Sequence, residues 1–127
     1  MDGALHAADW RPGGAFLSDL SLWDVYRTQM PLLALLAPAQ ASDVFHSMLA
    51  LAAQTNFSHL PHWVWANCET GCMPGSHGVV VLADFLQKGV PGPNASVLYR
   101  AAAAQLASQD AAEGYATLGF EIGRAHV

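Results

Sequence analysis

The sequence is short of charge, and above all of lysine. Charged residues make up 12% of the 127 residues, and Lys88 is the only lysine. A free-standing soluble domain carries about twice this fraction of charge. The formal net charge is −5, and no basic helix or basic patch is present, which argues against a nucleic-acid partner. The low charge favours a chain whose faces are covered by a larger body over an isolated small domain.

Long apolar runs are also missing. None reaches the roughly 18 residues that a membrane span needs, so no membrane partner is expected. Residues 1–4 lack the basic start of a signal peptide. Two N-glycosylation triplets, Asn56-Phe57-Ser58 and Asn94-Ala95-Ser96, weakly favour a secreted protein or the secretory pathway, and a cytosolic location stays open. The length suits one domain.

Cysteine is scarce, with Cys68 and Cys72 as the only two. They could pair only in an oxidising compartment and only if their loop folds back, and a reduced pair is an equal alternative. Together with His77 they would supply three zinc ligands. A structural zinc site needs four in recognised spacings, so no metal site is expected among these residues.

Helical periodicity is what the sequence does contain. Apolar residues fall at helical spacing after Ser21, and Ser21 with Asp24 three residues later has the form of a capping box. Pro31 ends this run because it lacks a backbone donor, and it can itself open a short helix through residue 37.

Further helices are expected downstream. Ser42 and Asp43 are predicted to open a helix whose apolar residues share one face. Residues 76–88 are predicted to be helical and closed by Gly89, residues 97–108 follow a cap at Asn94, and residues 115–119 resemble the start of another helix. Successive helical hairpins indicate an all-α toroid or bundle.

Residues 55–74 show no period and are rich in aromatics, histidines and turn formers. A structureless stretch of about 20 residues is uncommon inside a compact domain and is often functional. Trp63 and Trp65 lie within it. Burial onto the core is the first interpretation for both; the alternative is that one indole face serves as a platform for a sugar ring.

Three carboxylates are candidates for chemistry. From spacing alone, Asp24 is a helix-start acid paired with Arg27. The alternative is a carboxylate that accepts hydrogen bonds from two sugar hydroxyls while Arg27 holds its ionised form. Glu69 and Asp84 could act in acid–base catalysis, although a loop hydrogen-bond acceptor and a helix-surface acid are the favoured interpretations.

Four phrases of sequence occur in an order and spacing that resemble a known family. They are Ser21-Leu22-Trp23-Asp24 with Arg27 and Pro31-Leu32; Leu60-Pro61 with Trp63; Cys68-Glu69-Thr70 with Cys72-Met73, Gly75 and His77; and Ala83-Asp84 with Lys88-Gly89. Together they resemble the catalytic domain of glycoside hydrolase family 92, the exo-acting α-mannosidases. The resemblance runs from residue 18 to residue 89, and more loosely to residue 119.

The resemblance implies part of an (α/α)6 toroid, incomplete here and preceded in the intact protein by a β-sandwich domain. It implies calcium-dependent, inverting hydrolysis of mannose-terminated glycans. Asp24 would bind the non-reducing mannose, with Arg27, Trp63, Glu69 and His77 at or near that pocket. The family's general acid, base and most calcium ligands lie in motifs further downstream that no stretch here matches, so no catalytic residue is assigned.

The last six residues, 122–127, look like the translation of a cloning adapter. Residues 1–121 are therefore expected to be a partial catalytic domain, inactive alone, whose partners are the rest of that domain and the β-sandwich. Two alternatives stay open: a small helical interaction module without catalysis, and another (α/α)6 glycosidase.

Overall fold

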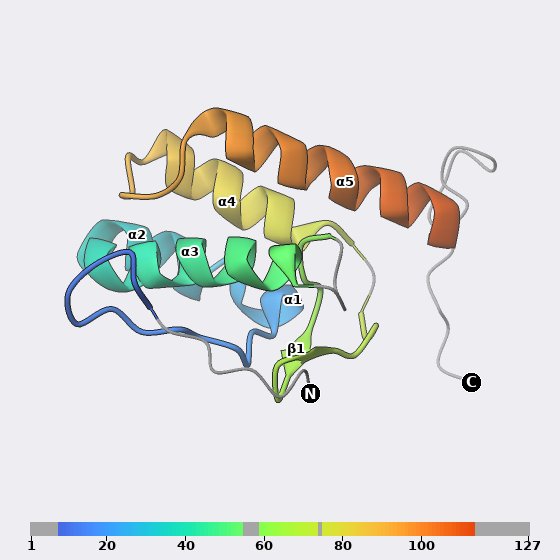
Figure 1. Cartoon of the computed structure of the whole chain (residues 1–127), viewed down its shortest axis with the longest axis horizontal. Coiled ribbons are helices and arrows are strands. Elements are labelled where there is room, and N and C mark those ends of the chain that lie inside the picture. Colours follow the sequence, from blue (N-terminus) through green and yellow to red (C-terminus); the bar gives the residue numbers. More distant parts are fainter. Residues whose placement is uncertain (1–7, 55–58, 74, 114–127) are drawn as a thin grey trace.

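Helices dominate the part of the chain that the computed structural model describes, residues 8–54, 59–73 and 75–113. In these ranges there are five helices and one antiparallel two-stranded hairpin (Figure 1). The all-α prediction is confirmed. The elements are α1 (Leu22–Val25), α2 (Gln29–Leu36), α3 (Pro38–Ala53), β1 (Val64–Trp65), β2 (Cys68–Glu69), α4 (His77–Gln87) and α5 (Ala95–Glu113).

The core forms where α3 meets the helices around it. α2 and α3 are a helical hairpin joined at Ala37, α4 packs against both, and α5 lies over α4 and α3 (Figure 1). Phe45, Met48 and Leu51 of α3 are fully buried together with Phe85 of α4. The rings of Phe45 and Phe85 lie 6.2 Å apart. Each such side chain contributes about 1.5–3 kcal/mol to stability through burial.

Two helices begin earlier than predicted. α2 begins at Gln29, which places Pro31 in its first turn, where a missing N–H breaks no helical bond. α3 begins at Pro38 and not at Ser42, which is buried inside the helix together with Asp43. Pro38 was interpreted as the end of the preceding helix. It also opens the next one, because its fixed φ suits the first helical position.

The last two helices have the predicted caps, although α5 runs from residue 95 to residue 113 and not from 97 to 108. Gly89 follows α4 with a φ of 70°, the left-handed conformation of a C-terminal cap, and the N–H of Val90 donates to the carbonyl oxygen of Phe85 at 3.0 Å. At the start of α5, Oδ1 of Asn94 accepts the N–H of Val97 at 3.1 Å. The predicted cap at Asn94 is confirmed. The helix predicted from residue 115 lies outside the described residues.

A β-hairpin lies within the stretch that was predicted to have no regular structure. Its strands pair in register over two residues each. The connecting residues Ala66 and Asn67 have φ of 48° and 58°, as in the tight turn whose twist matches that of the flanking strands. Asparagine adopts this conformation readily, whereas alanine rarely does. Of the two turn residues, only Asn67 is therefore of a type that indicates such a turn from sequence. Residues 55–58, with the first glycosylation triplet, lie outside the described residues.

The segment before α1 runs beside α3 (Figure 1) and is anchored there by Asp43. Arg11 donates through Nε to Oδ1 of Asp43 at 2.9 Å and through Nη2 to Oδ2, and the indole N–H of Trp10 donates to Oδ1 at 2.9 Å. The N–H of Leu17 donates to Oγ of Ser47 at 2.9 Å. Burial alone would raise the pKa of Asp43, but the guanidinium, the indole and a backbone N–H together hold that pKa below its ordinary value.

The turn between α4 and α5 touches the core through Gly92. A Cβ at this position would lie 2.3 Å from Cδ1 and 2.4 Å from Cε1 of Phe45, and the ring cannot move away because it is fully buried. We expect Gly92→Ala to lower the free energy of unfolding by about 1–3 kcal/mol, the cost of overpacking, as measured by urea unfolding. In a Phe45→Leu background the same substitution should cost less. Equal costs in the two backgrounds would show that Phe45 is not the constraint.

Candidate functional site

The start of α1 is joined to the β-hairpin through backbone pairing. Ser21 forms an isolated antiparallel bridge with Trp63, and the N–H of Val64 donates to the carbonyl oxygen of Leu20 at 3.1 Å. The side chain of Ser21 makes no capping bond to α1. The predicted capping box of Ser21 and Asp24 is therefore wrong, because the backbone of Ser21 is held in pairing with the hairpin.

Glu69 organises the hairpin from within. Its Oε2 accepts the N–H of His62 at 2.7 Å, and its Oε1 accepts the N–H groups of Trp63 at 3.2 Å and Gly71 at 3.0 Å. The carboxylate thus holds both ends of the loop that carries Trp63. A general acid would have to carry a proton on one of these oxygens, so the bonds agree with the interpretation of Glu69 as a loop acceptor.

The end of α1 meets the start of α4 through an aromatic pair. The rings of Tyr26 and His77 are stacked, with centroids 4.2 Å apart and planes 18° from parallel. Arg27 adds to this pair: its Nε donates to the phenol oxygen of Tyr26, and its Cζ lies 4.9 Å from the centre of the phenol ring. Gly75 leaves room for the imidazole, since a Cβ there would lie 2.8 Å from Nε2 of His77.

Asp24 and Arg27 are both exposed on or just after α1. The predicted pairing between them is absent from the described part of the chain, where the ion pairs are Arg11–Asp43 and Lys88–Asp84. Arg27 lies instead on Tyr26. In the same part of the chain the carboxylate of Asp24 has no hydrogen-bonding partner, so its oxygens are open to solvent and to a ligand.

Of the two tryptophans considered from sequence, Trp63 is partly buried and Trp65 is exposed. The carbonyl oxygen of Trp63 accepts the N–H of Thr70 at 3.1 Å and the hydroxyl of Thr70 at 2.8 Å. Trp65 of β1 is 66% exposed, and Trp23 of α1 is 47% exposed. An indole face is therefore accessible beside Asp24 in the sequence as well as on the hairpin.

The five predicted residues fall into three groups, on or next to the β-hairpin, α1 and the start of α4. Trp63 and Glu69 share a hydrogen bond within the hairpin, and the hairpin is paired with the residue that precedes α1. Arg27 and His77 meet on Tyr26, where α1 packs against α4 (Figure 1). Asp24 lies on α1 between these two contacts. An exposed carboxylate, a guanidinium and an imidazole near an indole can bind a polyhydroxylated ring through hydrogen bonds and apolar contact.

Other candidates are outside this arrangement. Asp84 accepts a bond from Lys88 at 2.7 Å on the surface of α4, as a helix-surface acid would. Cys68 and Cys72 are not joined in a disulfide. Across the described residues no three His, Cys, Asp or Glu side chains gather as a metal site, and no helix there is long and apolar enough to cross a membrane.

Sequence reasoning missed two contacts of this region. The helical spacing after Ser21 includes Tyr26 among the apolar residues of one helix face, although an aromatic residue directly before an arginine is a weak signal for their contact. The imidazole Nε2 of His62 meets the side-chain amide of Gln105 on α5, and Gln105 is buried. No local pattern could predict this pair, because the two residues are separated by 43 positions.

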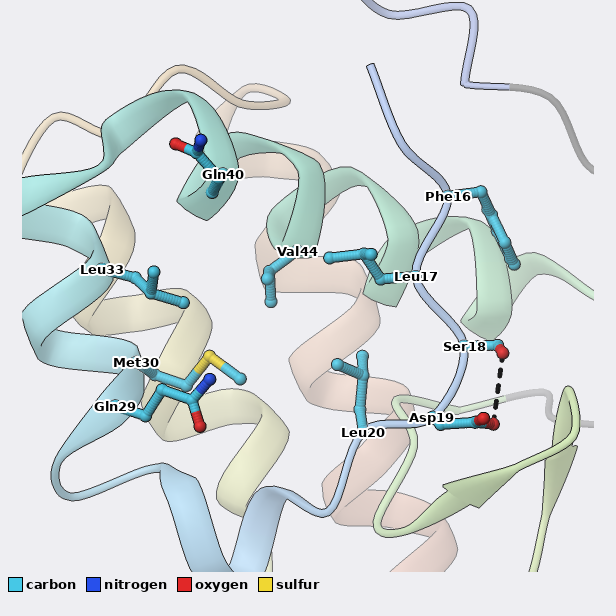
Figure 2. A pocket seen from close by; sticks show the side chains of 10 residues that line it. All are labelled: Phe16, Leu17, Ser18, Asp19, Leu20, Gln29, Met30, Leu33, Gln40 and Val44. Atoms are coloured by element: carbon cyan, nitrogen blue, oxygen red, sulfur yellow. Dashed lines mark hydrogen bonds between the residues drawn. The ribbon is translucent and has the colours of Figure 1, made fainter. Parts of the chain in front are cut away.

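A pocket of ≈ 400 Å³ lies elsewhere, between the segment before α1 and helices α2 and α3 (Figure 2). Its walls are mainly apolar, with Leu17, Met30 and Val44 reaching inward, and Gln29 and Gln40 provide amide groups. None of the five predicted sugar-binding residues lines it. It is a gap between packed helices and not the site described above.

Comparison with known proteins gives one match. A family model described as "Glycosyl hydrolase family 92 catalytic domain" matches residues 1–122. The match extends beyond both ends of the four phrases, and it includes the segment anchored on Asp43 and helix α5. Neither the curated proteins nor the solved structures give a match.

Proposed function

The chain belongs to glycosyl hydrolase family 92, and on this basis we propose that it forms part of the mannose-binding pocket of an exo-acting α-mannosidase. The substrate is a mannose-terminated glycan. The observation that supports the proposal is that α1, which carries Asp24, is paired at its start with Trp63 of the β-hairpin and packs against α4, which begins at His77.

The binding roles follow from the contacts of each side chain. Asp24 accepts hydrogen bonds from two hydroxyls of the terminal mannose, a task that suits a carboxylate with no partner among the described residues. Arg27 and His77 contribute further polar groups at the same place. Trp63 supplies apolar surface, and Glu69 keeps the loop of Trp63 in shape through its three backbone bonds.

The bond-breaking groups belong to other parts of the enzyme. Inversion needs an acid and a base about 6.5–9.5 Å apart. Among the described carboxylates, Glu69, Asp43 and Asp84 are each engaged in hydrogen bonds or an ion pair. We propose that the acid, the base and the calcium ligands come from later segments, so that these 127 residues are inactive alone. Among the described residues no three His, Cys, Asp or Glu side chains gather to hold such an ion.

Exposed leucines support the proposal that further protein covers this chain. Leu32, Leu35 and Leu36 of α2 are 55%, 67% and 75% exposed, although α2 belongs to the helical hairpin that forms the core. Adjacent large apolar side chains are typical of an interface. In the proposal they meet other helices of the toroid, and a β-sandwich domain completes the enzyme.

The test is hydrolysis by the full-length enzyme that carries this chain. We expect it to release mannose from an α-mannobioside, and the first product seen by proton NMR should be the β-anomer. An α-glucobioside should not be cleaved. Removing calcium with EGTA should abolish activity, and adding calcium should restore it. Release of no mannose, or of α-mannose first, would overturn the proposal.

A further inference from the structure

Tyr26 touches two of the residues assigned to the mannose pocket. We infer that Tyr26 is a positioning residue, whose ring orients the imidazole of His77 and whose hydroxyl orients the guanidinium of Arg27. This inference rests on the proposed function, because that function gives His77 and Arg27 their role. Tyr26 itself need not touch the sugar.

The ring of Tyr26 restrains His77. A centroid separation of 4.2 Å with planes 18° apart is an offset-stacked arrangement of two aromatic rings. Gly75 lies so close to the imidazole that any side chain there would collide with Nε2 and Cε1. Gly75 thus gives the imidazole the room to lie on the phenol ring, and the stack limits how far the imidazole plane can turn. Sugar hydroxyls require well-directed donors and acceptors, since a hydrogen bond weakens steeply with poor alignment.

The hydroxyl of Tyr26 restrains Arg27. The guanidinium of an exposed arginine samples many rotamers, and ordering it on binding opposes affinity. Here Nε donates to the phenol oxygen while Cζ lies 4.9 Å from the ring centre. These contacts engage Nε, and among the described residues the terminal Nη groups of Arg27 make no hydrogen bond. The terminal groups are the ones that can reach a ligand.

The alternative is that Tyr26 only fills space, since it packs against the core cluster. The two ideas differ in what Tyr26→Phe and Tyr26→Leu should do. Phenylalanine keeps the ring and loses the hydroxyl, so it should preserve the orientation of His77 and release Arg27. Leucine removes both contacts. A space-filling role predicts instead that any loss follows the loss of stability.

The first readout is the ring proton signal of His77 in the full chain, labelled with carbon-13 at histidine and assigned by His77→Gln. We expect an upfield displacement, due to the stacked phenol, in the wild type and in Tyr26→Phe, and its loss in Tyr26→Leu. Tyr99→Leu is the matched control, because Tyr99 is 74% exposed on α5. An unchanged His77 signal in Tyr26→Leu would overturn the inference.

The second readout is kcat/KM for an α-mannobioside in the full-length enzyme. Tyr26→Leu should lower it about 2- to 10-fold, the range expected for one aromatic pair, chiefly by raising KM. In a His77→Gln background the same substitution should lower it less, and Tyr26→Phe should lose its effect in an Arg27→Gln background. These two pairs of substitutions form double-mutant cycles, and fully additive effects on kcat/KM in both cycles would overturn the inference.

The two readouts distinguish a failure of the proposed function from a failure of the inference about Tyr26. A wild-type enzyme that hydrolyses no α-mannoside would overturn the proposed function, whereas the His77 signal would still decide whether Tyr26 orients the imidazole. If Tyr26→Leu did not fold, the double-mutant cycle of Tyr26→Phe with Arg27→Gln would decide whether Tyr26 orients Arg27. A His77 signal in Tyr26→Phe that differed from that of the wild type would overturn the claim that the ring of Tyr26 orients His77.

Discussion

Asp24→Asn in the full-length enzyme should cut kcat/KM for α-mannosides by about 100-fold or more, with almost no change in melting temperature. Two hydrogen bonds to a charged group contribute about 1.5–3 kcal/mol each, and about 2.7 kcal/mol corresponds to 100-fold. Asp24 is exposed, and in the described part of the chain its carboxylate bonds to no other group. The stability change should therefore stay within about 0.5 kcal/mol. Steady-state kinetics and calorimetry on the same preparations measure both.

Asp84→Asn is the matched control for Asp24→Asn. It also removes one negative charge, but Asp84 is bonded to Lys88 on the surface of α4. We expect wild-type kinetics and a stability change of less than about 1 kcal/mol, as for other surface ion pairs. If Asp24→Asn instead cost about 1 kcal/mol of stability and left turnover intact, Asp24 would be a helix-start acid and not a sugar ligand.

Asp43→Asn should give the largest loss of stability among the substitutions considered. Removing one partner of a fully buried ion pair costs about 3–5 kcal/mol. The loss here should be smaller, about 2–4 kcal/mol by the same principle, because the Arg11 side chain is 32% exposed while that of Asp43 is 5% exposed. Urea unfolding of the full chain at neutral pH measures it, and Asp9→Asn, at an exposed position nearby, is the matched control.

The loss of unfolding free energy caused by Asp43→Asn should also depend on pH. The folded-state pKa of Asp43 is lowered, so its contribution to stability is fully present above the unfolded-state pKa of about 3.9. That contribution disappears as the pH falls through the lower, folded-state pKa. The difference in unfolding free energy between the wild type and Asp43→Asn should thus be constant near neutral pH and shrink below about pH 4. A difference that grew on acidification would contradict the described contacts.

Local signals explain which parts of the fold could be predicted from sequence. α4 has apolar residues at helical spacing and a glycine at its end, and α5 is rich in alanine and follows a capping asparagine; all of these signals act within a few residues. The start of α3 could not be predicted this way. Asp43 resembles a helix-opening acid, yet its partner Arg11 lies 32 residues earlier. Only the folded chain shows that Asp43 faces inward.

The candidate site, too, could be predicted only in part from the sequence. Asp24, Trp63 and His77 were selected through a family resemblance, and the family is confirmed by the match over residues 1–122. Their assignment to sugar binding stays a prediction. Sequence did not indicate the β-hairpin, because two-residue strands are too short for an alternating pattern and Ala66 is unfavourable in its turn. It did not indicate the Tyr26–His77 stack either, since that contact joins α1 to α4 across the hairpin.

The pairing of Ser21 with Trp63 has a consequence for the order of events on the ribosome. A nascent chain emerges from its N-terminus at about 5–20 residues per second, so residues 21–27 leave the ribosome before their structural partners exist. The backbone of Ser21 must wait for Trp63, and Tyr26 must wait for His77. Residues 21–27 are thus synthesised before the residues that fix them in place.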